Sequence, residues 1–355
     1  MTNLIRNCWY VAGWSWEFSD KPEARMIVGD PIVLFRTSKG KIAALEDRCV
    51  HRMAPLSLGR VEGDSIRCMY HGLKFDAGGQ CTEIPGQDLI PKQACVRQYP
   101  VVEKSNWIWV WMGDPERADP ARIADSKALD DPEWVLKTGQ LEYDANYELI
   151  NDNLLDLTHL AYVHANSFGA DEAWSLNRPN LEVLPDGVRS SRWIRNTPPT
   201  PPLGEAAEHE KVDIWTSYDF ILPGVFLLYT AIFEKGTAEA CHDEEPDPNR
   251  RVLFSNFTSQ AVTAVSERKT RYYYSWGPHS SQGDAEMAQA MIDVARQAFN
   301  EDKVMIEAQQ KVIDTNTDVR PMPTSADKSI TIFQRLMRKQ DEPQDAEGDL
   351  ESAAS

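Results

Sequence analysis

The chain lacks any hydrophobic run long enough to cross a membrane. A membrane-spanning helix needs about 18 or more consecutive apolar residues, and the 355-residue sequence contains no such run. The first eleven residues also lack the basic-then-apolar layout of a secretory signal. The sequence therefore predicts a cytoplasmic protein without a membrane partner.

Positive charge is also scarce. The chain has 37 Lys and Arg against 55 Asp and Glu, which gives a formal net charge of −18. Binding to a nucleic-acid backbone needs clustered Lys and Arg, so nucleic acid is excluded as a partner. An acidic surface favours solubility, or docking to a basic redox protein.

Cysteine is limited to six residues, and a cytosolic chain of this size keeps its thiols reduced. We interpret Cys49 and Cys68 as metal ligands because each lies close to a histidine. The other four are interpreted as small buried residues: Cys8, Cys81, Cys95 and Cys241.

Histidine is scarce too, yet four of the seven histidines fall into two patterns typical of metal ligands. The first pattern is Cys49-Val50-His51, then sixteen residues, then Cys68-Met69-Tyr70-His71. The second is Asn153-x-x-Asp156-x-x-His159-x-x-x-x-His164. One pattern offers soft thiolates and the other offers harder ligands, which indicates electron transfer coupled to oxygen chemistry.

The order of secondary-structure signals predicts an α+β fold with two domains. Residues 1–115 contain short strand-like runs, clearest at 31–36, 41–45 and 107–111, separated by Gly and Pro turns. Residues 116–338 begin with a connection, continue with a helix from Tyr147, and end with a helix at about 284–313. Between these helices we expect strands at 188–195, 213–221, 225–233, 251–259 and 268–276. Residues 339–355 are predicted to form a disordered acidic tail.

The first pattern is compatible with zinc or with an iron–sulfur cluster. Each loop supplies one Cys and one His, which fits a [2Fe–2S] cluster with two Cys on one iron and two His on the other. The alternative is a non-catalytic binding protein stabilised by structural zinc. Tyr70 either donates its hydroxyl to a ligand sulfur or serves in ordinary packing.

The second pattern predicts a polar stripe on an apolar helix, because residues three apart share a helix face. Buried polar groups are costly unless they are paired or bind something, so Asn153, Asp156 and His159 need a partner. His164 lies about 140° further round an ideal helix than His159. Both can bind one metal only if the helix distorts or ends between them, and residues 166–169 supply an ending.

Two imidazoles and one carboxylate on one side of an iron leave positions open for dioxygen and substrate. The C-terminal helix offers the carboxylate. Asp302 has Ala298, Phe299, Met305 and Ile306 three and four residues away, which places it on the apolar face. Glu301 is a weaker candidate, and Asp293 has polar neighbours and is expected to face solvent.

Several longer segments resemble the Rieske non-haem iron oxygenases, α-subunit type. They are RNCWYVA at 6–12, CVHRMAPLSLG at 49–59, CMYHGLKFDAGG at 68–79, IPGQ at 84–87, WVWMGDP at 109–115, NLLDLTHLAYVH at 153–164 and NEDKVMIEA at 300–308. Within this family the chain resembles the vanillate O-demethylase oxygenase component and relatives that act on dicamba or toluenesulfonate.

The resemblance implies an all-β Rieske domain followed by a catalytic domain with a helix-flanked antiparallel sheet. It also implies a ring-shaped homotrimer in which each cluster lies close to the neighbouring subunit's iron. The implied [2Fe–2S] ligands are Cys49, His51, Cys68 and His71. The implied ligands of a mononuclear Fe(II) are His159, His164 and Asp302. Asp156 would bridge His71 of one subunit to His159 of the next, and Asn153 would lie near the iron.

The activity implied is that of an oxygenase component that uses O₂ and electrons from an NAD(P)H-dependent reductase. It would hydroxylate an aryl methoxy or methyl carbon of a small aromatic substrate and release formaldehyde from a methoxyarene such as vanillate. The alternative within the same superfamily is an arene cis-dihydroxylating dioxygenase. Seven aromatic side chains are available for an apolar pocket: Trp193, Trp215, Phe220, Phe226, Tyr229, Tyr272 and Trp276. Arg192 or Arg195 could pair with a substrate carboxylate, although a solvent-facing position on a strand edge is the simpler expectation.

Overall fold

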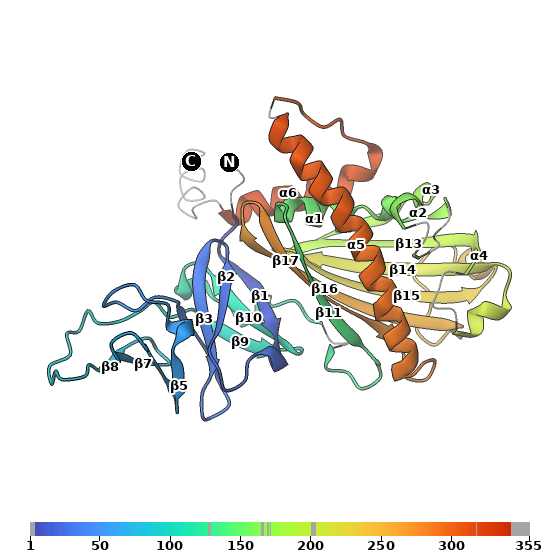
Figure 1. Cartoon of the computed structure of the whole chain (residues 1–355). Coiled ribbons are helices and arrows are strands. Elements are labelled where there is room, and N and C mark those ends of the chain that lie inside the picture. The colour runs from blue at the N-terminus through green and yellow to red at the C-terminus, as the bar shows by residue number, and fades with distance from the viewer. Residues whose placement is uncertain are drawn as a thin grey trace, which may run out of the picture.

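Three small antiparallel sheets make up the N-terminal part of the chain (Figure 1). The structure, a computed structural model, describes residues 4–126, 129–164, 167–168, 170, 172–199, 204–316 and 318–341. The first sheet has the order β1 (Cys8–Trp14), β10 (Trp107–Met112) and β9 (Val101–Lys104). The second has the order β2 (Glu23–Ile27), β3 (Asp30–Arg36) and β4 (Ile42–Glu46). The third contains β5 (Arg60–Glu62), β6 (Ser65–Arg67), β7 (Lys74–Asp76) and β8 (Cys81–Glu83).

A seven-stranded antiparallel sheet dominates the rest of the molecule (Figure 1). Its order is β11 (Lys137–Tyr143), β17 (Lys269–Pro278), β16 (Phe254–Ser266), β15 (Val225–Glu234), β14 (Val212–Ile221), β13 (Gly187–Thr197) and β12 (Asn180–Leu184). From β12 to β17 each strand pairs with the next in sequence, so the sheet is a meander of antiparallel neighbours. The α+β fold and the five strands expected here are confirmed, whereas β11 and β12 were not anticipated.

Helix α5 (Ala285–Thr315) crosses one face of this sheet and packs on β17 and β11 (Figure 1). It begins where the Asp284 carboxylate accepts the N–H groups of Glu286 and Met287, which stabilises the first turn. Its buried residues, among them Ala288, Ile292, Ala295, Phe299, Asp302 and Ile306, recur at helical spacing. The other α-helices are α1 (Tyr147–Leu155), α2 (Leu160–Val163), α3 (Ala173–Leu176), α4 (Thr237–Ala240) and α6 (Lys328–Asp341).

The first small sheet packs directly against the large one. The hydroxyl of Thr263 on β16 donates to the carbonyl of Val11 on β1 at 2.7 Å, and the hydroxyl of Tyr273 on β17 donates to the carbonyl of Ala12 at 2.7 Å. These four groups are buried, so the interface between the first small sheet and the large sheet belongs to the interior of the protein. Within the described ranges, no helix is both long and apolar enough to span a bilayer.

Three local expectations need correction. Cys8 and Cys81 are buried as predicted, but Cys241 is half-buried and Cys95 is exposed, because its segment pairs with Gln80 at a sheet edge. Helix α6 includes residues 339–341, which the sequence analysis assigns to the tail, and residues 342–355 lie outside the described residues. The helix expected from Tyr147 onwards is interrupted at Asp156, with consequences for the metal site described below.

Candidate metal centres

Two loops with the same hydrogen-bond pattern carry the Cys/His pairs. In the first loop, the N–H of Cys49 donates to the carbonyl of Ala54 at 2.8 Å, and the N–H of Met53 donates to the carbonyl of Cys49 at 2.9 Å. In the second, the N–H of Cys68 donates to the carbonyl of Leu73 at 2.8 Å, and that of Gly72 to the carbonyl of Cys68 at 2.9 Å. The repeated pattern presents one thiol and one imidazole from each loop.

The second loop needs a glycine where it turns back. Gly72 has a φ of +81°, in the left-handed region that glycine adopts without strain. A Cβ at this position would lie 2.8 Å from Cγ of Pro85. The segment at 84–87 therefore packs tightly against the loop that carries His71.

The four candidate ligands form two pairs of different exposure. The thiols of Cys49 and Cys68 are buried, whereas His51 and His71 are exposed, with ring centroids 4.5 Å apart. Burial, reinforced by the neighbouring Cys68 thiol, raises the pKa of Cys49 to about 11. A thiolate pair at this position is therefore costly unless a cation compensates it, which fits ligation of iron.

The separation into two pairs also distinguishes a two-iron cluster from one zinc ion. Four ligands of a tetrahedral zinc lie within roughly 4 Å of one another. In the described part of the chain, the one group of three or more such ligands that meets within 4.8 Å is His159, His164 and Asp302. The Cys/His residues thus fit a [2Fe–2S] cluster, and the zinc interpretation finds no support. The Tyr70 ring contacts His71, with centroids 4.0 Å apart, but its hydroxyl bonds to no other described residue.

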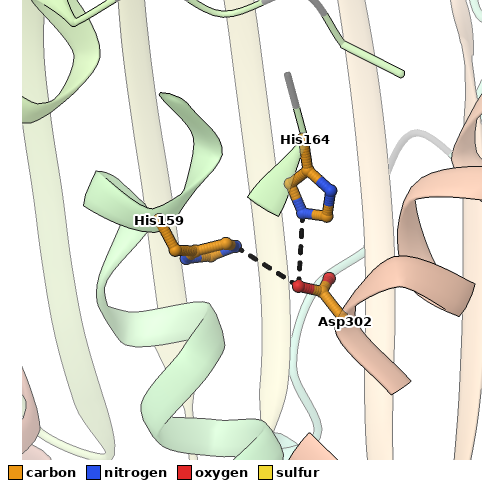
Figure 2. A group of neighbouring side chains, drawn as sticks. All are labelled: His159, His164 and Asp302. Carbon is orange, nitrogen blue, oxygen red and sulfur yellow. Dashed lines mark ion pairs between the residues drawn. The ribbon is translucent and has the colours of Figure 1, made fainter. Parts of the chain in front are cut away.

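A second centre forms where α5 approaches the segment after α1 (Figure 2). His164 Nε2 lies 3.2 Å and His159 Nε2 lies 3.7 Å from Oδ1 of Asp302. His164 and Asp302 are buried, and His159 is partly buried. The amide of Asn153 donates to the same Asp302 oxygen at 3.2 Å, so Asn153 lies beside the carboxylate.

The backbone break at Asp156 makes this convergence possible. Helix α1 ends at Leu155, and Asp156 is extended, with φ −122° and ψ 94°. Its carboxylate accepts the N–H of Thr158 at 2.9 Å and starts a short 3₁₀ turn, Leu157–His159. The continuous polar stripe is therefore a wrong prediction, because this cap competes successfully with the helical hydrogen bonds. The expected helix ending between the histidines is confirmed, since α2 ends at Val163; residues 166 and 169 lie outside the described residues.

Both imidazoles are held in the tautomer that a metal requires. His159 Nδ1 lies 2.6 Å from the carbonyl of Asp156, and His164 Nδ1 lies 3.0 Å from Oε2 of Glu301. A carbonyl oxygen and an ionised carboxylate can accept a hydrogen bond but cannot donate one. Each Nδ1 therefore carries the proton, and each Nε2 lone pair faces Asp302, as a metal ligand needs.

Glu301 has a role that the sequence analysis missed. Its carboxylate also accepts the Ser167 hydroxyl at 2.7 Å. Although burial opposes ionisation, the hydrogen bonds from His164 and Ser167 lower the pKa of Glu301. Burial likewise opposes protonation of His164, but Asp302 and Glu301 outweigh it and raise the pKa of His164. The same negative field would hold a divalent cation. In the sequence, the adjacent acidic residues at 301 and 302 were the signal that could have revealed this role of Glu301.

An apolar pocket adjoins this centre, with a cavity volume of about 120 Å³. Of the seven aromatic candidates, Phe226 and Trp276 line it. The other five pack elsewhere: Trp193 on Trp215 and Phe233, Phe220 on Phe333, Tyr229 on Trp134, and Tyr272 on Tyr143. The sequence analysis missed the polar lining residues Thr230, Asn256, Thr258 and Gln260. For Asn256, Thr258 and Gln260, the period-two spacing in one strand was the signal that could have revealed them; Thr230 on β15 has no such signal.

Neither candidate arginine lies in the pocket lining. Arg192 is buried, contrary to the solvent-facing expectation, and donates to the carbonyls of Trp174 and Asn177 at 2.9 and 3.1 Å. Arg195 is exposed and pairs with Asp243. In the two long connections of the large sheet, residues 204–208 form a 3₁₀ turn and 237–240 form α4, while 200–203 lie outside the described residues.

Comparisons with known families agree with this arrangement. Residues 8–100 match the Rieske [2Fe-2S] domain, and residues 143–341 match the vanillate O-demethylase oxygenase C-terminal domain. The chain is 38% identical over 344 residues to the iron–sulfur subunit of the toluene-4-sulfonate monooxygenase system of Comamonas testosteroni, covering 94% of this chain and 97% of the relative. It is 33% identical to the oxygenase component of dicamba O-demethylase from Stenotrophomonas maltophilia, over 95% of this chain and 97% of the relative.

Solved structures extend the similarity to the whole fold. The crystal structure of dicamba monooxygenase bound to dicamba superimposes with a TM-score of 0.83 at 31% identity, covering 99% of this chain and all of that one (100%). A further structure of dicamba monooxygenase has non-heme iron and dicamba, with a TM-score of 0.79 at 28% identity and full coverage (100%) of both chains.

Proposed function

The chain belongs to the Rieske non-haem iron monooxygenases of the vanillate O-demethylase family, and we propose that it hydroxylates the methoxy or methyl carbon of a small aromatic compound. It is an oxygenase component, so its electrons come from a reductase, which we propose to be NAD(P)H-linked. The observation that carries the proposal is the pair of Nδ1-protonated imidazoles facing Asp302 at the wall of an apolar pocket. We further propose that residues 1–115 and 116–338 act as the electron-transfer and catalytic domains.

In the first centre, Cys49 and Cys68 would hold one iron of the cluster and His51 and His71 the other. The buried thiols keep the sulfur side away from water, and the exposed imidazoles face outward. Replacing two thiolates by neutral imidazoles raises a cluster's reduction potential. An outward imidazole pair suits electron exchange with a group outside this polypeptide.

That exposure supports a homotrimer as the working assembly. The cluster loops follow β4 and β6 in the N-terminal sheets, whereas His159 belongs to the 3₁₀ turn after α1 and Asp302 to α5, which crosses the large sheet (Figure 1). We propose that Asp156 of a neighbouring subunit meets His71 and links it to His159. Asp156 is only half-buried and is one residue from the 3₁₀ turn that carries His159, so its carboxylate is accessible for such a contact.

In the second centre, His159, His164 and Asp302 would hold Fe(II), which supplies O₂ binding and activation at its open positions when it is bound. Asn153 holds one Asp302 oxygen, and Glu301 holds the His164 ring. The apolar side chains of the pocket exclude water and place the substrate carbon beside the centre. A methoxy group hydroxylated on its methyl carbon becomes a hemiacetal, which loses formaldehyde and leaves a phenol.

The test is turnover by the holoprotein with a surrogate reductase, NADH and a panel of methoxyarenes and methylarenes. The expected products are formaldehyde and the matching phenol, in equal amounts, from a methoxyarene, or the benzylic alcohol from a methylarene, with O₂ uptake in either case. A cis-diol without formaldehyde would instead identify an arene dioxygenase. O₂ uptake that yields only hydrogen peroxide with every methoxy and methyl arene would refute the proposed reaction.

A further inference from the structure

The sheet side of the pocket carries polar side chains that the proposed chemistry at iron does not use. Thr230 on β15 and Asn256 on β16 both line the cavity, and the strand register places them directly opposite each other. Directly opposed residues on antiparallel strands have adjacent side chains. The two groups therefore form one polar patch in the wall, beside a second polar pair on β16, Thr258 and Gln260.

The orientation of the Asn256 amide follows from its neighbour. The indole N–H of Trp276 donates to Oδ1 of Asn256 at 2.9 Å. An indole nitrogen can only donate, so the amide oxygen must face Trp276 and the NH₂ group must face away. Asn256 is only 7% exposed, yet its NH₂ group has no acceptor among the described residues. The NH₂ nitrogen is not one of the fully enclosed unpartnered atoms, so it is open to the cavity and available to a ligand.

The other polar wall residues already satisfy one another. The Thr258 hydroxyl donates to the carbonyl of Ser275, so its oxygen is left to accept from Nε2 of Gln260 at 3.3 Å. Oε1 of Gln260 in turn accepts the hydroxyl of Tyr272. On the strands of the wall, Asn256 and Thr230 thus keep free hydrogen-bonding capacity, since the Thr230 hydroxyl also bonds to no described residue. Across the pocket, the indole N–H of Trp174 on α3 also lacks a partner and could add a third donor.

No lysine or arginine lines the described pocket. The guanidinium of Arg192 lies behind the Trp174 ring, 5.5 Å from its centroid, and donates to backbone carbonyls. At the metal end, the carboxylates of Asp302 and Glu301 together balance a divalent cation. An anionic substrate group would therefore lose its water without gaining an opposite charge, which is unfavourable.

We propose that the amide N–H groups of Asn256, with the hydroxyl of Thr230, select an uncharged hydrogen-bond-acceptor group on the aromatic substrate. It follows that this chain binds neutral methoxyarenes or methylarenes in preference to carboxylated or sulfonated ones. The inference rests on the proposed function, because it assigns the substrate class of that same pocket.

The test uses equilibrium binding to the oxidised holoprotein without a reductase, followed by calorimetry at pH 8. The probes are 4-methoxybenzamide, 4-methoxybenzoate and methoxybenzene, which have the same ring and methoxy group. We expect the benzamide to bind at least tenfold more tightly than the benzoate, a difference of about 1.4 kcal/mol. Equal or tighter binding of the benzoate would overturn the inference.

Two variants assign the effect to the patch. Asn256→Asp keeps the shape and the acceptor for Trp276 but removes the N–H donors, so benzamide affinity should fall at least tenfold while methoxybenzene affinity stays unchanged. Thr230→Val should weaken benzamide binding several-fold, and Thr230→Ser, which keeps the hydroxyl, should not. If either variant folds with its metals and retains the full benzamide preference, that residue is not part of the selecting group. Because no reductase is present, absence of demethylation would count against the proposed function alone.

Discussion

Glu301 and Asp302 are neighbours in sequence, yet their carboxylates hold opposite nitrogens of one imidazole. Glu301 Oε2 lies 3.0 Å from Nδ1 of His164, and Asp302 Oδ1 lies 3.2 Å from Nε2 of the same ring. The first contact sets the tautomer and the second marks the metal position. Consecutive residues of an α-helix diverge by about 100°, so the two carboxylates can reach opposite sides of the same ring.

This pairing predicts a loss of metal affinity when Glu301 is changed. Glu301→Ala removes the acceptor that orients His164, and changes of this kind typically weaken metal binding by about 10–100-fold. Iron retained after timed exposure to a chelator is the measurement, with the [2Fe–2S] absorption as an internal reference. Asp293→Asn, on the exposed side of the same helix, is the matched control. Iron retention equal to that of the control would show that the contact has no part in binding.

Removing the Asp302 carboxylate should affect the mononuclear iron site and leave the [2Fe–2S] cluster intact. Asp302→Ala leaves two imidazoles for the mononuclear iron, so we expect that iron and all turnover to be lost. The cluster's visible and EPR signals should persist, because its ligands lie in a different sheet region. Iron and acid-labile sulfide determinations, together with turnover, give the answer. Full iron content with normal turnover would remove Asp302 from the ligand set.

The bridging proposal for Asp156 is testable without disturbing its local structural role. An Asn side chain can still accept the Thr158 N–H and cap the 3₁₀ turn. Asp156→Asn should therefore retain both metals and the parent melting temperature. Electron arrival at the second centre should slow by at least tenfold, as measured by single-turnover product formation from the reduced protein. An unchanged single-turnover rate would exclude the bridge.

A buried acid on α1 predicts an unusual dependence of stability on pH. Burial, with help from nearby Glu148, raises the pKa of Asp152 to about 7. In the unfolded chain the same carboxyl titrates near pH 4, so the folded state binds more protons between these values. The contribution of Asp152 to the free energy of unfolding should therefore fall as pH rises from about 4 to 7, by up to about 1.4 kcal/mol per pH unit, and level off above 7.

Asp152→Asn removes this titration. The variant should show a flatter dependence and greater stability than the parent protein at pH 8, measured by denaturant unfolding across that range. Asp20→Asn, on the exposed surface, serves as the control and should follow the parent curve. A variant that runs parallel to the parent from pH 5 to 8 would contradict the assignment.

Local chemistry explains which features could be predicted from the sequence. Only a few types of side chain bind metals, and Cys, His and carboxylates are the main ones. Their spacing in two short segments was therefore informative by itself. Helical periodicity was enough to select Asp302 over Asp293, because its neighbours three and four residues away are apolar. Strand alternation and turn residues likewise anticipated most of the large sheet, in which sequential strands pair.

The remaining features depend on contacts between distant segments. The break at Asp156 arises from one capping bond that competes with a continuing helix, a balance that periodicity does not resolve. Arg192 was expected to face solvent but is buried under α3, because the carbonyls of Trp174 and Asn177 accept hydrogen bonds from its guanidinium. Five of seven aromatic candidates pack outside the pocket, since hydrophobicity alone does not specify which face of a packed sheet a ring occupies.

The sequence by itself determined the ligand types, the α+β class and the order of the elements, because these depend on residue chemistry and on interactions a few positions apart. Only the tertiary structure decided that Glu301 orients His164, that Asn256 and Thr230 stand opposite each other, and that no lysine or arginine among the described residues lines the pocket. Those relationships join residues far apart in the chain. Their geometry is set by how α5 and the strands pack, which no local pattern encodes.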